Sequence, residues 1–600
     1  MHGHRVNPAA TTDSLSLLSD RKSLWSRASV ALAYAILLAG LLTTTAAIYM
    51  VIASYSSLPS TDGWEQIDIA LRGVNPLSPA WLWAQHNEHR MVIPKLFLAA
   101  DLLLFRARQK LMLTSILVTQ FLLLTLLAWS MRALGGWRGT MWRTGVGIAA
   151  FCLFWPTQWE NFIIGFSICF VLLEFFATLS LVELVLYWKH SERQPRDRHA
   201  WVHLMLSILA ALGATYSLSN GNLLWPLLVA AALLLRLRLA ATLSFLITGA
   251  VSTTLYLHNY HRPLGHGNPI SSIRAPLEIF QYIATYFGSP WVRHYVPLAT
   301  CIGIVGLAAA FFVLFRFRGY LRAGRLFPVL LVLILVFCLG TAFITSLGRL
   351  NFGIRQAFAS RYHTFALLFW CCLGLLLLMS ESVTENKRVR FLVVQLCILG
   401  IIVWSSHITR NDVRGARLRG FEINVAATAM FVGGYDEVQF AKAAITNPRA
   451  VPSEAQFLQK NGLSAYADNA YAQLGKPLQS VYALAPSEEC TGLVESAATV
   501  EGNGQSRAVR IAGWVWDREH QRPPSAIVMT EDGIIAGLGV VGEWRPMTLV
   551  DNRRIKDGYI GYAGYARVVQ LDAPLKMYAI LRGNPQSACY FATVESPERP

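Results

Sequence analysis

The chain has 600 residues, of which 54% are apolar and 14% are charged, and its mean hydropathy is +0.41. This composition excludes a water-soluble globular protein with an ordinary surface and indicates a multipass membrane protein. The formal net charge of +17 does not indicate a nucleic-acid partner, because the basic residues lie in short clusters between apolar segments, as in the cytoplasmic loops of membrane proteins.

Eleven apolar segments of about bilayer length follow a polar N-terminal tail, residues 1–27, that lacks the features of a cleaved signal peptide. We therefore expect a mainly α polytopic membrane protein. The predicted spans are 28–54, 111–131, 142–158, 162–188, 201–219, 221–236, 239–258, 297–315, 326–347, 364–380 and 391–408.

The basic clusters between these segments predict their orientation. The run 91–105 is ambiguous, since it could cross the membrane or lie in its interface. If it does not cross, the clusters "RALGGWRGTMWR", "KHSERQPRDRH", "RLR", "RFRGYLRAGR" and "NKRVR" all lie on the side of the basic N-terminus. The positive-inside rule then predicts eleven spans, a cytoplasmic N-terminus and an external C-terminus.

This topology gathers the other polar segments on the outer face. Polar groups at membrane level are costly unless they line a water-filled cavity or pair with one another. The segments contain Trp, Arg and carboxylates, which favours a functional site over plain connecting loops. They are "STDGWEQID" (60–68), "HNEHR" (86–90), "TQWEN" (157–161), "SLSNGN" (217–222), the loop 259–296 and "GRLNFGIRQAFASRYH" (348–363).

The composition changes beyond the last predicted span. Residues 409–485 are mixed and partly helical in pattern, and from Cys490 onward short alternating runs with an "EDGI" turn predict a β-sandwich. Cys490 and Cys589 bracket these strands and would pair in an oxidising exterior. The predicted domains are a cytoplasmic tail (1–27), a transmembrane domain (28–408), an extracytoplasmic linker region (409–485) and an extracytoplasmic sandwich (486–600).

The order of these features resembles the GT-C superfamily of membrane glycosyltransferases over residues 28–408. A carboxylate-bearing outer loop follows the first span, and an Arg-Tyr element precedes a late span. The stretches "HNEHR", "QWENFIIGF", "SNGNLLWP" and "GIRQAFASRYHTF" resemble a signature shared by a group of bacterial membrane proteins that we place near that superfamily. The resemblance implies an inner-membrane enzyme that transfers a sugar from a polyprenyl-phosphate donor to an outer-face glycan or lipid of the cell envelope.

Such a reaction needs cations for the leaving phosphate and a carboxylate base for the acceptor hydroxyl. Asp62 lies where the superfamily places its catalytic aspartate, so it is the candidate base, and Glu65 is a candidate substrate contact. The alternative is structural: Asp62 and Glu65 have the spacing of a capping box, with Gly73 ending the helix. In the sandwich, Trp514, Trp516 and Tyr565 would either stack on an acceptor sugar or belong to the core.

The "HNEHR" cluster supports two interpretations. His86, Glu88 and His89 could bind a divalent cation, or Arg90 with a histidine could contact phosphate while Glu88 holds Arg90. His-x2-His is a weaker metal pattern than His-x3-His, so phosphate or sugar contact is the preferred interpretation. A structural salt bridge is the remaining alternative.

The last outer segment and "QWEN" supply the other candidate ligands. Arginines above a bilayer suit a lipid phosphate, although they also snorkel at the interface. Side chains in "QWEN" could bind sugar hydroxyls or cap the adjoining helices. The candidates are Arg349, Arg355, Arg361, Tyr362, Glu160 and Asn161.

Two other functions remain open from the sequence. One is a transferase of the O-antigen ligase or polymerase type, which uses a pyrophosphate donor and arginines without metal. The other is a transporter or flippase of envelope lipids, for which a polar residue inside a span, Glu174, is the main support.

Overall fold

The computed structural model describes most of the chain. Residues 1–8 of the predicted tail, 194–197 of one basic cluster, 264–271 of the loop 259–296, and the end of the predicted sandwich lie outside the described residues. The described ranges are 9–193, 198–263, 272–380, 385–445, 447–502, 507–546, 549–550, 553–555, 557–568, 573–583 and 586–595.

Every predicted apolar segment contains a helix in the structure. Within the described ranges, eight helical stretches are long and apolar enough to cross a membrane, whereas α6, α9 and α10 are not among them, so the count of eleven crossings stays a prediction. The helices are α1 (Ala9–Ala53), α5 (Lys110–Ala133), α6 (Gly139–Phe154), α8 (Ile168–Arg193), α9 (Arg198–Thr215), α10 (Leu224–Leu234), α11 (Leu239–Leu257), α14 (Val296–Arg322), α15 (Leu326–Arg349), α16 (His363–Ser380) and α17 (Glu385–Trp404).

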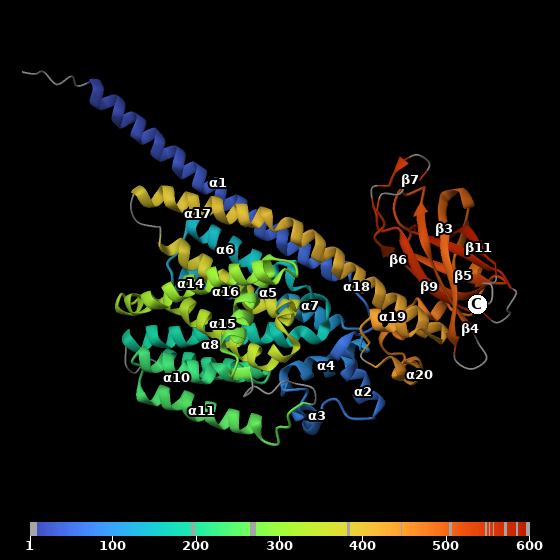
Figure 1. Cartoon of the computed structure of the whole chain (residues 1–600), viewed down its shortest axis with the longest axis horizontal. Coiled ribbons are helices and arrows are strands. Elements are labelled where there is room, and N and C mark those ends of the chain that lie inside the picture. The colour runs from blue at the N-terminus through green and yellow to red at the C-terminus, as the bar shows by residue number, and fades with distance from the viewer. Residues whose placement is uncertain are drawn as a thin grey trace, which may run out of the picture.

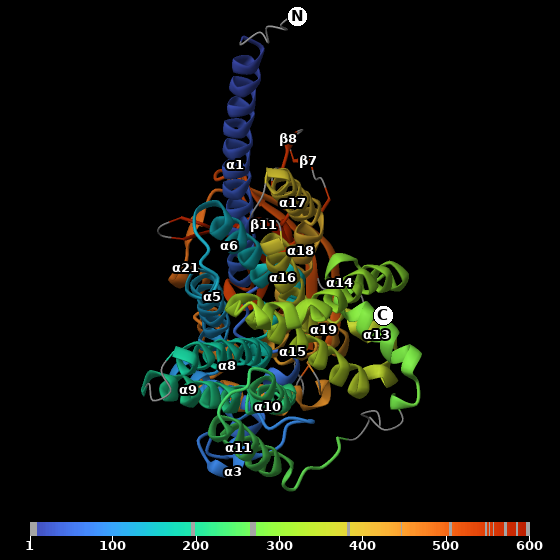
Figure 2. The same ribbon diagram turned by 90° about the vertical axis from the view of Figure 1, so that its left-hand side faces the viewer.

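These helices form one bundle, with α1 and α11 on opposite sides of it (Figures 1 and 2). Glycines allow a close crossing between α1 and α6. A Cβ added at Gly40 would lie 2.5 Å from the carbonyl oxygen of Gly147, and one at Gly147 would lie 2.7 Å from that of Ile36. Small residues at a helix crossing let backbones approach and increase van der Waals contact, which is a main source of helix association in a membrane.

Short elements cover one end of the bundle and carry the polar segments that are predicted to be external. The 14-residue α4 (Val92–Phe105) is too short to cross a bilayer alone, and α13 (Pro276–Gly288) forms inside the predicted loop 259–296. The other elements here are η1 (Thr61–Trp64), α2 (Glu65–Leu71), α3 (Pro79–Trp83), η2 (Pro156–Gln158), α7 (Trp159–Ile163), η3 (Gly165–Ser167), η4 (Ser219–Leu223), η5 (Ser289–Trp291), η6 (Leu350–Phe352), η7 (Ile354–Phe358) and η8 (Ser360–Tyr362).

A long helix leads from the bundle to the C-terminal domain. Only Ser405 separates α17 from α18 (Ser406–Val432), and the two run nearly in line past α1 (Figure 1). The predicted linker region therefore begins as a continuation of the last membrane helix. It ends in short helices, α19 (Glu437–Lys442), α20 (Val451–Asn461) and α21 (Leu478–Val481).

The C-terminal domain is a sheet domain, as predicted. Nine strands form one sheet in the order β1-β3-β4-β9-β6-β5-β10-β11-β2, and β7 pairs with β8 separately. The strands are β1 (Gly434–Tyr435), β2 (Ala483–Ala485), β3 (Cys490–Gly502), β4 (Arg507–Asp517), β5 (Ala526–Glu531), β6 (Ile534–Glu543), β7 (Leu549–Val550), β8 (Arg553–Arg554), β9 (Gly561–Val568), β10 (Leu575–Leu581) and β11 (Ser587–Val594).

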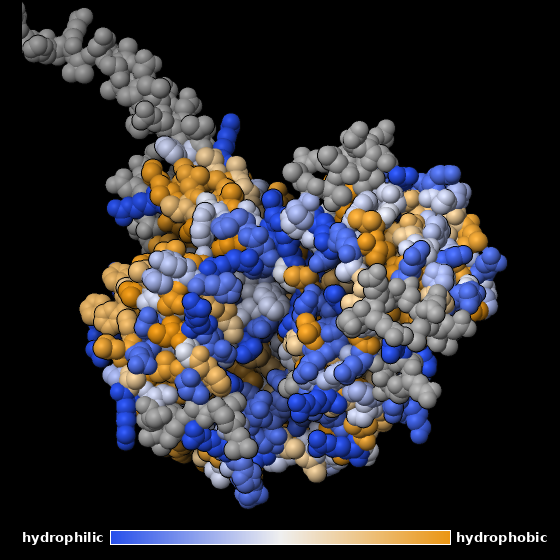
Figure 3. Space-filling model, turned by 45° about the vertical axis from the view of Figure 1, so that its right-hand side comes forward, coloured by the Kyte–Doolittle hydropathy of each residue, from blue (hydrophilic) through white to orange (hydrophobic). Residues whose placement is uncertain are grey.

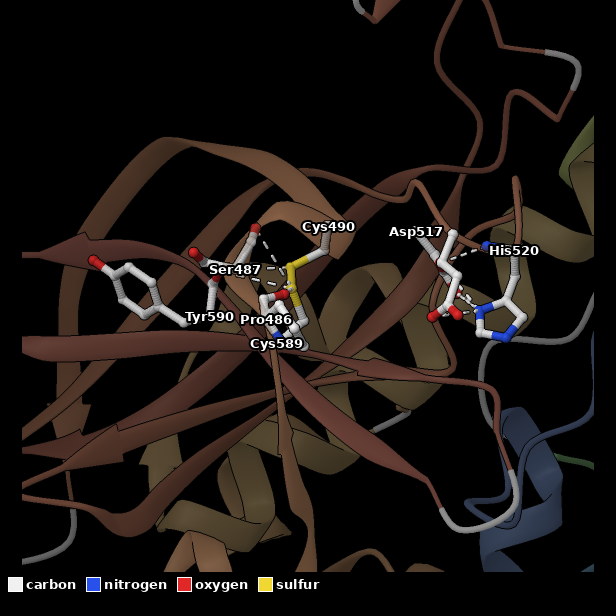
Figure 4. Close-up of a disulfide and its surroundings, with 8 residues drawn as sticks. Pro486, Ser487, Cys490, Asp517, His520, Cys589 and Tyr590 are labelled. Carbon is white, nitrogen blue, oxygen red and sulfur yellow. Dashed lines mark hydrogen bonds and ion pairs between the residues drawn. A yellow bond between two sulfur atoms is a disulfide. The ribbon is translucent and has the colours of Figure 1, made fainter.

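This sheet folds over on itself. Buried residues of β4 and β9, such as Ile511 and Tyr562, share one apolar core with Met529 of β5 and Met577 of β10. Cys490 of β3 and Cys589 of β11 form a disulfide with their Cα atoms 6.1 Å apart, which is the pairing expected from the sequence (Figure 4). The two halves of the sheet are therefore both packed and covalently joined.

The face of β4, β6 and β9 that points away from this core is also buried, because α18 packs against it. Tyr565 is fully buried in this contact, and its hydroxyl donates to Asp436 at 2.6 Å. Trp516 is 4% exposed and packs on Ile560. Tyr565 and Trp516 are thus core residues, and the interpretation of them as sugar-stacking side chains is wrong because their ring faces are covered.

Candidate functional site

The outer polar segments meet in one cluster. The carboxylate of Glu65 lies 2.7 Å from His86, and Glu88 pairs with Arg349, so the first outer loop, "HNEHR" and the last outer segment are connected. Three further contacts attach the remaining segments. They are His89 with the Ser219 amide (3.4 Å), Glu160 with Arg361 (3.6 Å), and Gln85 with the His261 carbonyl (2.5 Å).

Asp62 lies at the start of η1, directly after Thr61, whose φ of 53° is in the left-handed region. Its side chain is 51% exposed and its carboxylate is 4.0 Å from Nε2 of His86. The capping-box interpretation is wrong: the N-cap residue is Ser60, and no side-chain cap bond forms at η1 or α2. Asp62 therefore presents an accessible carboxylate beside the cluster.

Glu65, His86 and Lys95 form a charge network behind Asp62. The carboxylate of Glu65 is 2.7 Å from Nδ1 of His86 and 3.4 Å from Nζ of Lys95. Lys95 is fully buried and also donates to the carbonyls of Trp81 and Ala84. A buried ammonium is stable only when it is paired in this way.

Burial alone would raise the pKa of Glu65, but the hydrogen bond and charge of His86 and the charge of Lys95 outweigh it and lower that pKa. Burial likewise opposes the charged form of His86, yet Glu65 and Asp62 raise the pKa of the imidazole above its ordinary value. Burial lowers the pKa of Lys95, and Glu65 offsets part of that effect. The network thus favours an ionised Glu65 and a protonated His86, so Glu65 is already satisfied within the protein.

The "HNEHR" segment is a tight turn. His86 and His89 exchange two backbone hydrogen bonds of 2.8 Å, and Asn87 takes a left-handed φ of 48°. The turn sends its side chains in different directions. His86 points to Glu65, whereas Glu88 pairs with Arg349 and lies 3.6 Å from His89. The proposed joint metal ligation by His86, Glu88 and His89 is therefore not the arrangement observed.

The environment of Arg90 contradicts the phosphate contact that was predicted for it. Its side chain is buried, and its guanidinium donates to the main-chain carbonyls of Tyr256 (2.6 Å), Trp83 (2.7 Å) and His258. Glu88 pairs with Arg349 and does not hold Arg90. The predicted phosphate contact is wrong, because this guanidinium already bonds three carbonyls and fixes the turn to the end of α11.

Glu160 and Asn161 of "QWEN" both contact Arg361. The Glu160 carboxylate accepts from the Arg361 amide at 3.0 Å and lies 3.6 Å from its guanidinium. The Asn161 amide donates to the Arg361 carbonyl at 2.9 Å and to Thr364 at 2.6 Å. Both residues were predicted as sugar contacts, whereas in the structure they position Arg361, whose side chain remains 36% exposed.

Arg355 and Tyr362 differ in exposure. Arg355 is exposed on η7, whereas Tyr362 is 6% exposed and its ring lies under the Arg361 guanidinium, 5.3 Å from it. Tyr362 also stacks on Tyr286 of α13 at 5.7 Å. Tyr362 therefore supports Arg361, and Arg355 is free of such packing.

Two contributors to this cluster, Lys95 and α13, are not expected from the sequence. Tyr282 of α13 is fully buried, and its hydroxyl has no hydrogen-bond partner among the described residues. Its pKa is raised by burial and by Tyr362, while Arg349 and Arg361 act in the opposite direction, so both guanidinium groups lie near this hydroxyl. Lys95 was overlooked because it stands inside an apolar run, and its partner Glu65 is distant in sequence.

Glu174, the residue that favours a transporter, lies in the middle of the bundle. It is 1% exposed, and its carboxylate accepts from Gln120 of α5 at 3.1 Å. Its surroundings are apolar helix surfaces, including buried cysteines of α15 and α16. Glu174 therefore joins two neighbouring helices, α5 and α8, by a hydrogen bond.

The cluster of polar segments combines an accessible carboxylate, Asp62, with a partly accessible guanidinium, Arg361. The charge of Asp62 contributes to the raised pKa of Arg361, so the two groups are close enough for their charges to interact. On the face shown in Figure 3, the surface is hollowed between the helical part and the sheet domain, and hydrophilic residues surround much of the hollow. Such an arrangement can accept a proton at one position and bind a phosphate at another.

No protein-family model matches this chain, and no curated protein matches it. Among solved structures, it is similar to the archaeal oligosaccharyltransferase AglB from Archaeoglobus fulgidus in complex with an inhibitory peptide and a dolichol-phosphate (10% identity, TM-score 0.38, covering 68% of this chain and 59% of that one). It is also similar to the apo form of that enzyme (10%, 0.39, 68% and 60%). The chain spans about 59% of the length of the AglB chain, and a likeness at this score assigns no activity.

Proposed function

We propose that the chain is a membrane glycosyltransferase that transfers a sugar from a polyprenyl-phosphate donor to an acceptor of the cell envelope at the outer face. The observation that carries this proposal is a cluster that contains an exposed carboxylate, Asp62, and a partly exposed guanidinium, Arg361, close enough for their charges to interact. The charged groups that pair within the protein are Glu65, His86, Glu88, Arg90, Lys95 and Arg349.

In this mechanism the acceptor hydroxyl attacks the anomeric carbon while Asp62 takes its proton. The phosphate leaves with the electron pair of the broken glycosidic bond, and Arg361 stabilises its charge, with Arg355 as a second cation at the rim. Lys95 pairs with Glu65, and Glu65 holds His86 beside Asp62, 4.0 Å from its carboxylate.

The test replaces Asp62 by Asn, which keeps its size and removes the basic oxygen. Cells that lack the chain should accumulate a polyprenyl-phosphate-linked sugar. Wild type should clear it, and Asp62→Asn should leave it, with transfer reduced by at least about a hundredfold at normal protein level. Asp68→Asn on α2 is the matched control and should clear it. Normal transfer by Asp62→Asn would refute the assignment of the base.

The same extracts separate the proposed donor from that of a ligase or polymerase. Accumulation of a sugar on polyprenyl pyrophosphate, with none on polyprenyl monophosphate, would replace the proposed donor by the pyrophosphate class. Arg361 and Arg355 suit either headgroup, since guanidinium binds both kinds of phosphate oxygen.

A further inference from the structure

A cavity lies among the membrane helices, apart from the polar cluster described above. It has a volume of about 760 Å3, and none of the predicted site residues lines it. Its walls come mainly from α6, α14, α16 and α17, and most of its lining side chains are apolar. Phe312 and Trp404 are 60% and 53% exposed at its margin, so the cavity opens sideways toward the lipid.

The cavity is long and narrow. On α14 its lining runs from Ile302 to Tyr320, which at 1.5 Å per residue is about 27 Å. This length is close to the ~30 Å apolar thickness of a bilayer.

Charge is confined to one end of this cavity. The charged residues in its lining are Arg316, in the last turns of α14, and Arg325, immediately before α15, with Tyr320 between them. Both arginines are exposed, and the Arg316 guanidinium lies over the Phe312 ring at 5.7 Å. This is the end that the basic loop "RFRGYLRAGR" predicts to be cytoplasmic.

We propose that this cavity binds an anionic glycerophospholipid, with one acyl chain inside and its phosphate held by Arg316 and Arg325. The apolar walls match a hydrocarbon chain, and two guanidinium groups at the headgroup level match a phosphate with no compensating ammonium. A zwitterionic lipid would bring its own cation to these arginines. A polyprenyl donor whose headgroup is at the outer site would leave both arginines facing an uncharged chain.

The experiment measures the phospholipid that stays bound to the purified chain. Protein in detergent is incubated with equal amounts of phosphatidylglycerol and phosphatidylethanolamine, repurified, and analysed by native mass spectrometry. Wild type should retain phosphatidylglycerol in about one-to-one ratio and prefer it at least about tenfold. Arg316→Ala/Arg325→Ala should lose this preference.

Two variants make this result specific. Arg318→Ala/Arg322→Ala removes the same charge from the same helix outside the lining and should keep the preference. Gly374→Leu leaves both arginines in place and fills the cavity, because an added Cβ meets only Ile148 at 3.5 Å, and it should reduce retention of both lipids.

Equal retention of the two lipids by wild type would overturn the proposal. An equal loss of the phosphatidylglycerol preference in both arginine double variants would also overturn it. The third contrary result is that wild type retains a polyprenyl phosphate, and that Gly374→Leu displaces this lipid but not phosphatidylglycerol. If the Arg316/Arg325 variant does not fold, the wild-type preference and Gly374→Leu still decide. None of these outcomes depends on Asp62, so the lipid site and the proposed transfer reaction stand or fall separately.

Discussion

The turn 86–90 and the segment 353–362 are both polar, both predicted to be external, and both rich in charge, yet they use that charge differently. In the turn, the guanidinium of Arg90 bonds three carbonyls, and His86 is paired with Glu65. In the segment, Arg355 is exposed and Arg361 keeps a third of its side chain accessible. The first therefore builds the cluster, and the second is available to a ligand.

The largest effect that this difference predicts is on stability, at Arg90. Arg90→Ala leaves the carbonyls of Trp83, Tyr256 and His258 without their donor in a buried position, at a cost of about 3 kcal/mol. The free energy of unfolding in detergent should fall by that amount. Arg355→Ala removes the same charge from the exposed segment and should change it by less than about 0.5 kcal/mol. Equal effects would erase the distinction between the two regions.

Arg361→Ala should act on the ligand instead. It removes a phosphate contact present in both the ground state and the transition state, so donor binding and transfer should fall together, by about tenfold. Arg361→Lys should recover part of the affinity because it restores the charge without the bidentate geometry. The measurement is binding of polyprenyl phosphate to purified protein. Unchanged binding with lowered stability would move Arg361 into the same class as Arg90.

His86→Gln tests the electrostatic role of the turn through its pH dependence. The raised pKa of His86 means that its stabilising contribution is full below the ordinary histidine pKa and is lost as pH rises through the folded value. Wild type should thus exceed the variant by about 1.5 kcal/mol at pH 6 and by less at pH 9. A difference in unfolding free energy that is constant with pH would show that His86 is not charged in this network.

Glu454 gives the smallest effect and the opposite pH trend. Burial, and then the charge of Asp68, raise its pKa to about 7, so the folded state binds a proton that the unfolded state releases near pH 4.5. Stability from this group is therefore full below its ordinary pKa and is lost as pH rises toward 7. Glu454→Gln should stabilise the protein by about 1 kcal/mol at pH 8 and not at pH 4. Glu437→Gln, on the exposed start of α19, should show no such trend.

Much of the helical architecture was predictable because bilayer-length apolar runs are a strong signal. The sequence also predicted which outer segments meet, since one topology placed them on one face. It did not predict α13, whose 13 residues are too few to cross a membrane and are interrupted by Glu278, Gln281 and Thr285. It did not separate Arg90 from Arg361 either, because their roles depend on carbonyls and carboxylates supplied by distant segments.

The capping-box pattern at Asp62 shows another limit. Local spacing favoured a bond between neighbours, whereas Glu65 found stronger partners in His86 and Lys95 through tertiary contact. A residue's local motif is a weak guide when a charge-assisted bond is within reach elsewhere. The sheet domain was easier to predict, since alternating polar and apolar residues indicate strands. Its two cysteines lie near the first and last of these strands, which indicated their pairing.

The nearly continuous helix from α17 through α18 has a mechanical meaning. The helical stretch Val389–Val432 has 44 residues, or about 66 Å, and the sheet domain packs against its far end. At Gly420 it presses against the chain directly after α1, where an added Cβ would lie 2.4 Å from the Ser54 carbonyl oxygen. This contact lies eight residues before Asp62 in the sequence. The same helix therefore contacts both the sheet domain and the segment of chain that leads to the carboxylate, and so connects the two.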